Sequence, residues 1–239
     1  SLIENTTRDS ANALMGMRGY IDVLIPRGGK GLIKNVVENS TVPVIETGAG
    51  NCHLYVDSAA DIEMALKVAL NAKCQRPSVC NAIETILVHR DVAGEFLPKF
   101  YELTRDFNLE FRGCAETCLI LKGILPATDE DFNTEYDDYI VSVKVVGDVY
   151  EAVNHIRKYS TGHSESIITN DEKNAEYFTR AIDSCVLYEN ASTRFTDGGE
   201  FGLGAEIGIS TQKLHVRGPM GLEALTTFKY IIKGEGQVR

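Results

Sequence analysis

The sequence predicts a layered α/β fold, in which helices cover a β-sheet. Along most of the 239 residues, amphipathic segments with helical spacing alternate with short apolar runs of strand type, the pattern of α/β domains. Hydrophobic residues make up 44% of the chain and charged residues 24%, as expected for a globular protein with a sizeable core. We therefore expect one large domain or two smaller ones.

The charge and the apolar pattern argue against two classes of partner. With a formal net charge of −10, the chain lacks the clustered Lys and Arg that bind phosphate backbones, so we expect no nucleic acid. No apolar run approaches the roughly 20 residues of a membrane helix, and we expect no membrane partner. The six cysteines are dispersed and no secretory leader is seen, which is typical of free thiols in the cytoplasm. Cys114 and Cys118 have metal-ligand spacing, but no second pair follows, so we predict no metal site.

The first sixty residues predict two helices and three strands around a glycine-rich turn. This turn, Arg27 to Gly31, follows an apolar run and precedes a helical pattern. Small residues at such a place let an anion or a cofactor phosphate reach backbone N–H groups at a helix start, although a tight structural turn is the alternative. The predicted helices span 7–17 and 32–37, and the predicted strands span 20–26, 42–46 and 52–56.

The remaining chain alternates helices and strands up to a long irregular segment. The predicted helices begin at 58 and span 91–105, 148–159 and 172–183, and the predicted strands span 83–89, 120–125, 139–146, 165–169 and 185–188. Residues 190–221 contain seven glycines. Loops of that length are usually functional, with a flexible surface connection as the alternative. A helix over 222–228 and a final strand over 229–233 complete the prediction.

Cys80 is the strongest candidate for a reactive side chain. It lies between the helix that begins at 58 and the strand 83–89, and Pro77 before it disfavours helical torsions. A thiol on such a loop is accessible, whereas a thiol buried on a helix or strand is usually inert. Taken alone, however, most cysteines at such positions are small core residues.

Six motifs follow one another along the chain: IPRGGKGLI (25–33), ETGAGNCH (46–53), QRPSVCNA (75–82), NASTRF (190–195), GLGAEIGIST (202–211) and RGPMGLEALTT (217–227). In this order they closely resemble the γ-glutamyl phosphate reductase family, a branch of the aldehyde dehydrogenase superfamily. Together they cover essentially the whole chain, which makes the resemblance specific.

The resemblance implies an aldehyde dehydrogenase-like, three-layer αβα fold. Chains of this family are longer at the N-terminus, so the first part of the nucleotide-binding domain is expected to be missing. Residues 1–60 would be the rear part of a Rossmann-like NADP-binding domain and 61–199 the catalytic α/β domain. Residues 200–239 would return to the cofactor domain and end in an oligomerisation strand, which implies a homo-oligomer.

The reaction that the resemblance implies is the NADPH-dependent reduction of γ-glutamyl phosphate to glutamate 5-semialdehyde and phosphate. This is a step of proline biosynthesis that follows glutamate 5-kinase. Cys80 would attack the acyl phosphate and form a thioester, which hydride then reduces. Its backbone N–H would donate to the developing oxyanion. Because half of the nucleotide site is absent, we expect the chain alone to be inactive.

The resemblance also assigns roles to two sets of side chains. Glu46 matches the acid/base glutamate of the superfamily, and Glu135 matches the one that holds the nicotinamide ribose. The expected cofactor-binding residues are Arg27, Gly28, Gly29, Gly31 and Glu135.

The substrate carboxylate requires an arginine, since the guanidinium fork matches a carboxylate. Arg194 is the first candidate, with Ser192 and Thr193 beside it. Arg217 is the competitor, with a structural link as its alternative role. Arg76, near Cys80 in sequence, either lowers the pKa of the thiol or is a solvated loop residue.

Two other functions remain open. A non-phosphorylating aldehyde dehydrogenase would hydrolyse the thioester with Glu46 as base, although the QRPSVC and NASTR contexts argue against it. A catalytically silent association or regulatory module is the second alternative, against which the retention of Cys80, Glu46 and Glu135 argues.

Overall fold

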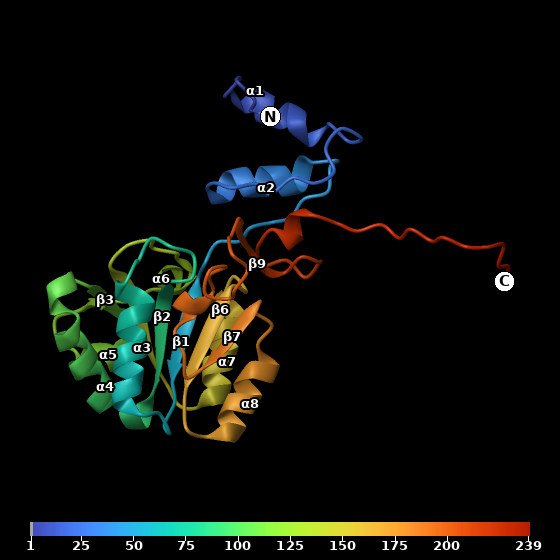
Figure 1. The fold of residues 1–239 in the computed structure, drawn as a ribbon. Helices are drawn as coiled ribbons and strands as arrows, with labels where there is room; N and C mark the ends of the chain where they lie inside the picture. Colours follow the sequence, from blue (N-terminus) through green and yellow to red (C-terminus); the bar gives the residue numbers. More distant parts are fainter. Residues whose placement is uncertain (1) are drawn as a thin grey trace.

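The computed structural model describes residues 2–239 and contains a seven-stranded parallel sheet (Figure 1). Its strands are β1 (Cys52–Val56), β2 (Ile83–His89), β3 (Glu110–Gly113), β4 (Leu125–Pro126), β5 (Ile140–Val146), β6 (Ser164–Ile168) and β7 (Val186–Glu189). They run in the order β4-β3-β5-β2-β1-β6-β7, with β2 and β1 near the centre. We call residues 52–189 the sheet unit.

Helices cover both faces of the sheet, which confirms the three-layer prediction (Figure 1). The helices of the unit are α3 (Ile62–Cys74), α4 (Arg90–Leu103), α5 (Ala115–Ile120), α6 (Asp129–Asn133), α7 (Val149–Tyr159) and α8 (Glu172–Ala181). Side chains alternate between the faces of a strand. Leu54 therefore packs in the cluster under α3 and α4, whereas Tyr55 packs in the cluster under α7 and α8.

Local sequence signals set where these helices begin. Three of them begin after an aspartate whose carboxylate accepts backbone N–H groups of the first turn, as at Asp61, Asp148 and Asp171. Such caps satisfy donors that have no partner inside the helix. The parallel strands are thus joined by well-defined helices, and this explains why most of their bounds were predicted to within a few residues.

Residues 2–50, which we call the first region, differ from the prediction. They contain α1 (Arg8–Met15) and α2 (Lys30–Asn39), as predicted. The predicted strands 20–26 and 42–46 share only one parallel bridge, in which the Leu24 N–H donates to the Pro43 carbonyl at 2.8 Å and the Ile45 N–H to the Leu24 carbonyl at 2.9 Å. Two short segments cannot satisfy a strand's backbone groups on both sides, so the predicted strands are wrong here.

The position of β1 bears on the division into domains. Cys52–Val56 falls in the range 1–60 that we expected to belong to the cofactor domain, yet it pairs with β2 on one side and β6 on the other. We therefore propose the boundary near residue 50, just before β1.

Two other parts of the chain differ from the sequence prediction. The predicted strand 120–125 is the end of α5 followed by the two-residue β4, and β3 and α6 were not predicted. Short elements with mixed polarity leave little periodicity in the sequence.

The C-terminal part contains β8 (Gly208–Ser210) paired with β9 (Gly218–Met220) and the short 3-10 helix η3 (Glu223–Leu225). The predicted helix 222–228 is thus reduced to one turn. Residues 226–239 extend away from the sheet unit without forming a strand within the described chain (Figure 1). Their pairing with a second subunit stays a prediction. Among residues 2–239, no helix has both the length and the apolar character that a bilayer crossing requires.

Candidate active site

Cys80 lies on the connection between α3 and β2, as predicted. The loop is anchored through Asn81, which is almost fully buried. The Asn81 side-chain amide donates to the Thr196 carbonyl at 2.8 Å, and the Thr193 hydroxyl donates to the Asn81 carbonyl at 2.6 Å. The irregular segment after β7 therefore fixes the backbone beside Cys80.

The backbone of Cys80 also rests directly on the segment before β1. A Cβ atom added to Gly50 would lie 1.6 Å from the Cys80 carbonyl oxygen, so only glycine fits there. The buried Cys52 thiol donates to the same carbonyl at 3.2 Å. Two segments far apart in the sequence, one before β1 and one after β7, thus hold the loop at Cys80.

A cavity of about 430 Å³ opens beside Cys80. It brings together five of the residues that the sequence predicted, from both sides of the boundary near residue 50. Its lining residues are Arg27, Gly28, Gly29, Ile33, Thr47, Gly48, Ala49, Cys80, Glu135, Asp137, Glu206, Gly208 and Ile209. A volume of this size accommodates a small substrate together with part of a cofactor.

Acidic groups dominate the electrostatics around the thiol. Burial, followed by the charges of Glu206 and Glu135, raises the pKa of Cys80 to about 11, while Arg194 opposes this shift. The resting side chain is therefore a thiol at neutral pH and must lose its proton to react. Arg194 is thus the cation that favours the thiolate, whereas the Arg76 side chain is exposed.

Glu135 is held at the cavity by the backbone just before β1. The Gly50 N–H donates to Glu135 Oε1 at 2.6 Å. A single glycine thus contacts the loop that carries Cys80 and positions one of the predicted cofactor ligands.

The predicted carboxylate-binding residues divide into two groups. The Arg194 guanidinium contacts the loop that carries Cys80, where its Nε donates to Gln75 Oε1 at 3.0 Å and its Nη1 donates to Asn81 Oδ1. Ser192 and Thr193 are buried, and the Ser192 hydroxyl accepts the Arg194 N–H at 3.2 Å. Their hydroxyls support the loop, so of this trio only Arg194 extends a charged group beside Cys80.

Arg217 and Glu46 lie outside the lining of this cavity. Both outer nitrogens of Arg217 bind Asp183, through its carboxylate at 2.9 Å and its carbonyl at 2.7 Å. This ties the C-terminal segment to the start of β7. The Glu46 N–H donates to Gln212 Oε1 at 3.1 Å, so the Glu46 backbone joins the first region to the same segment.

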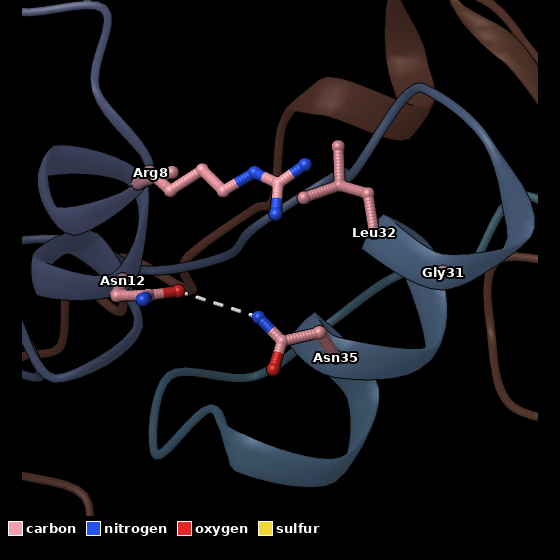
Figure 2. A pocket seen from close by; sticks show the side chains of 6 residues that line it. Arg8, Asn12, Gly31, Leu32 and Asn35 are labelled. Carbon is pink, nitrogen blue, oxygen red and sulfur yellow. Dashed lines mark hydrogen bonds between the residues drawn. The ribbon is translucent and has the colours of Figure 1, made fainter.

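A second hollow of about 520 Å³ lies between α1 and α2 (Figure 2). The Arg8 side chain extends toward Leu32 across it, and the Asn35 amide donates to Asn12 Oδ1 at 3.3 Å along its floor. Gly31 lines this hollow, whereas Gly28 and Gly29 line the cavity beside Cys80. The glycine-rich turn therefore borders both hollows.

Sequence reasoning missed Asn81, Asp137 and Glu206. Asn81 and Glu206 stand inside the recognised motifs, but nothing in their local pattern shows that Asn81 is buried and anchors the loop, or that Glu206 lines the same cavity as Cys80. Among residues 2–239, no group of three His, Cys, Asp or Glu side chains is arranged to hold a metal ion.

Comparison with solved structures identifies the class of fold. An acetylating aldehyde dehydrogenase from Geobacillus thermoglucosidasius superposes with a TM-score of 0.76 at 17% identity, over 98% of this chain and 61% of that one. The chain therefore has an aldehyde dehydrogenase-like fold. No protein-family model matches it.

Within that class the similarity is much higher to one enzyme. Gamma-glutamyl phosphate reductases from Heliobacterium modesticaldum and Clostridium acetobutylicum are 60% identical over 238 and 237 residues, which are 100% and 99% of this chain. The crystal structure of gamma-glutamyl phosphate reductase from Thermotoga maritima superposes with a TM-score of 0.95 at 54% identity, over 99% of this chain.

The chain is thus homologous to gamma-glutamyl phosphate reductases along its whole length, and this confirms the resemblance found in the motifs. It spans about 57% of the length of each of these three relatives.

Proposed function

We propose that this chain is the catalytic portion of a γ-glutamyl phosphate reductase, which reduces γ-glutamyl phosphate with NADPH through a thioester on Cys80. The observation that carries the proposal is the cavity in which Cys80, Glu135 and the glycine-rich turn meet. The 60% identity to reductases of that name supports the choice of substrate.

The geometry accounts for the first chemical step. The Cys80 sulfur attacks the acyl carbon, and the C–O bond to phosphate breaks with its electron pair leaving on the phosphate. The charge of the Arg27 side chain, which lines the cavity, would stabilise the anionic leaving group and the developing oxyanion. Glu46 lies outside the cavity lining, which suits a reaction that needs no hydrolytic water.

The residues present also fit a nicotinamide dinucleotide, which when bound supplies the hydride. α2 begins after its N-cap residue Gly29, which supplies no side-chain cap, so backbone N–H groups at the start of the helix are available to a phosphate. The turn Gly28 to Gly31 would hold the pyrophosphate between the two hollows. Glu135 would bind the nicotinamide ribose beside Cys80, and Arg8 extends a cation into the hollow at the other end.

Arg194 is the residue that we propose binds the α-carboxylate of the substrate. Its guanidinium acts on the Cys80 thiol, whereas Arg217 is engaged with Asp183. If this is right, Arg194→Lys raises the substrate concentration for half-maximal thioester formation about 10-fold or more, since the bidentate pair is lost. Arg217→Lys should leave it nearly unchanged.

The remaining expectations belong to the same proposal. The first region would be the rear part of the NADP-binding domain, and residues 226–239 would add a strand to a second subunit. The acyl phosphate would come from glutamate 5-kinase, and the enzyme would act in the cytoplasm. NADPH binding and hydride transfer would be weak or absent in this chain alone.

The test is the direct detection of the thioester by mass spectrometry. γ-Glutamyl phosphate is generated in situ from glutamate and ATP by a glutamate 5-kinase, and the acyl adduct is located by peptide mapping. We expect it on Cys80, its loss in Cys80→Ser, and its retention in the control Cys118→Ser. An adduct on another cysteine, or none on a Cys80 that still reacts with iodoacetamide, would contradict the proposal.

A further inference from the structure

The Cys80 thiol needs a proton acceptor, and the predicted acid/base residue does not lie in its cavity. Glu46 is absent from the lining, and its backbone is tied to Gln212 instead. Three other carboxylates do line the cavity: Glu135, Asp137 and Glu206. One of these three carboxylates would have to accept the proton of Cys80.

Glu135 is engaged with the backbone that holds it. Its Oε1 accepts the Gly50 N–H at 2.6 Å, a shorter hydrogen bond than the 2.9 Å one that Glu206 accepts from the Gly198 N–H, so the anionic form of Glu135 is the more firmly stabilised of the two and the weaker base. Among the charged groups around Cys80, Glu206 has the largest effect on the pKa of the thiol. Of the two carboxylates that act on Cys80, Glu206 is therefore the better candidate.

Glu206 lines the cavity and is positioned through one of its two carboxylate oxygens. Its Oε2 accepts the Gly198 N–H at 2.9 Å. A Cβ atom on Gly198 would lie 2.5 Å from the Ala205 carbonyl and 2.9 Å from Glu206 Cβ, so the two parts of the segment are in direct contact. The segment after β7 thus folds back on itself and presents this carboxylate to the cavity.

We propose that Glu206 is the group that accepts the proton of Cys80 when the thioester forms. The identity of the acyl substrate rests on the function proposed above. The proton transfer from Cys80 to Glu206 does not depend on it. The S–H bond breaks, its proton goes to Glu206, and the sulfur electron pair forms the C–S bond. The carbonyl electron pair moves onto oxygen as the C–S bond forms, and it re-forms the C=O bond as the C–O bond to phosphate breaks and phosphate leaves with that electron pair. Glu206 then returns the proton to solvent.

The surroundings of both groups suit this role. Partial desolvation in the cavity and the charge of Asp197 raise the pKa of Glu206, which makes it a better base than an exposed carboxylate. Cys80 and Glu206 share the cavity without a direct hydrogen bond in the described chain, so a water or the bound substrate completes the contact. The ionisable groups around Glu206 are Asp197, Arg27 and Arg194. Those around Cys80 are Glu135, Asp137, Cys52 and Cys185.

Alkylation of Cys80 by iodoacetamide tests the proposal without substrate or cofactor. The rate at Cys80 is measured against pH by peptide mapping in the wild type and in Glu206→Gln, whose amide oxygen still accepts the Gly198 N–H. If Glu206 only repels the thiolate, its removal speeds alkylation at pH 7. If it accepts the proton, the variant is about 10- to 100-fold slower at pH 7, even though the thiol becomes more acidic.

Two further variants keep the outcome interpretable. Glu206→Asp should restore part of the neutral-pH rate, and Glu200→Gln, an exposed carboxylate of the same segment, should match the wild type. A thermal unfolding curve confirms that each variant is folded. Faster alkylation in Glu206→Gln, or slow alkylation that Glu206→Asp does not rescue, would overturn the proposal.

The experiment is independent of the proposed substrate. If no glutamyl thioester forms but the alkylation result holds, the proposed function is wrong and the role of Glu206 stands. If the thioester forms with equal rates in wild type and Glu206→Gln, the proposed function stands and the proposed role of Glu206 is wrong.

Discussion

The sheet unit and the first region contain similar apolar runs but bury them very differently. Leu54 and Ile86 on the central strands are 0% exposed, whereas Tyr20 in the first region is 87% exposed. Each central strand has a hydrogen-bonded neighbour on both sides, while the run 20–26 shares one bridge with residues 42–46. An apolar run becomes a strand only where its backbone groups find partners as well as its side chains.

The largest difference should appear on truncation of an aromatic side chain. Phe100 is 0% exposed and stacks on Phe96 with ring centroids 5.5 Å apart, so Phe100→Ala should cost about 3–5 kcal/mol of unfolding free energy. Tyr20→Ala should cost less than about 0.5 kcal/mol. Urea unfolding followed by circular dichroism measures both. Equal losses would mean that Tyr20 is buried in solution and that the comparison fails.

Acid should destabilise the sheet unit specifically, because two of its histidines, His155 and His163, are buried. Burial lowers the pKa of His163 to about 4 and that of His155 to about 2, whereas an unfolded histidine titrates near 6.5. Below pH 6.5 the unfolded chain binds protons at these two histidines, whereas the folded chain does not. The free energy of unfolding therefore decreases as pH falls through 6.5. The expected slope is about 1.4 kcal/mol per pH unit for each histidine, until the folded pKa is reached.

Urea titrations at pH 7, 6 and 5 measure this slope. In His163→Gln the slope should fall by about 1.4 kcal/mol per pH unit, the contribution of that one histidine. The described first region contains no histidine, so it should contribute nothing to the slope. An unchanged slope in the variant would show that His163 is accessible to protons.

The smallest effect is expected between α1 and α2. Asn35→Ala removes the exposed hydrogen bond to Asn12 at 3.3 Å, and we expect a loss of no more than about 0.5 kcal/mol. A loss above about 1 kcal/mol in the same urea experiment would show that the floor of this hollow is more firmly packed than its exposure suggests.

Most of the sheet unit was predictable because its elements carry strong periodic patterns and caps. β2 was predicted with its observed bounds, Ile83–His89, since a buried parallel strand is a continuous apolar run between turn residues. The first region misled the same reasoning, because a pattern records which residues favour burial and not whether a neighbouring strand exists. The short β3 and α6 were missed because four or five residues are too few to show a period.

The sequence predicted the site residues that the motifs identify, but not the tertiary contacts between them. The sequence located Cys80 on its loop and paired it with Glu135 and the glycine-rich turn. It did not indicate that Glu206 lies beside the thiol, or that Asn81 anchors the loop. These depend on how the segment after β7 folds back, and tertiary contacts of a glycine-rich segment have no local signature.

Gly50 has a further consequence for how substitutions act on this chain. It has no side chain and takes part in no bond-making step, yet its N–H reaches Glu135 and its Cα has no room for even a methyl group beside Cys80. In a systematic substitution map, position 50 should therefore be as intolerant as position 80. A search for functional positions guided by side-chain chemistry alone would pass over it.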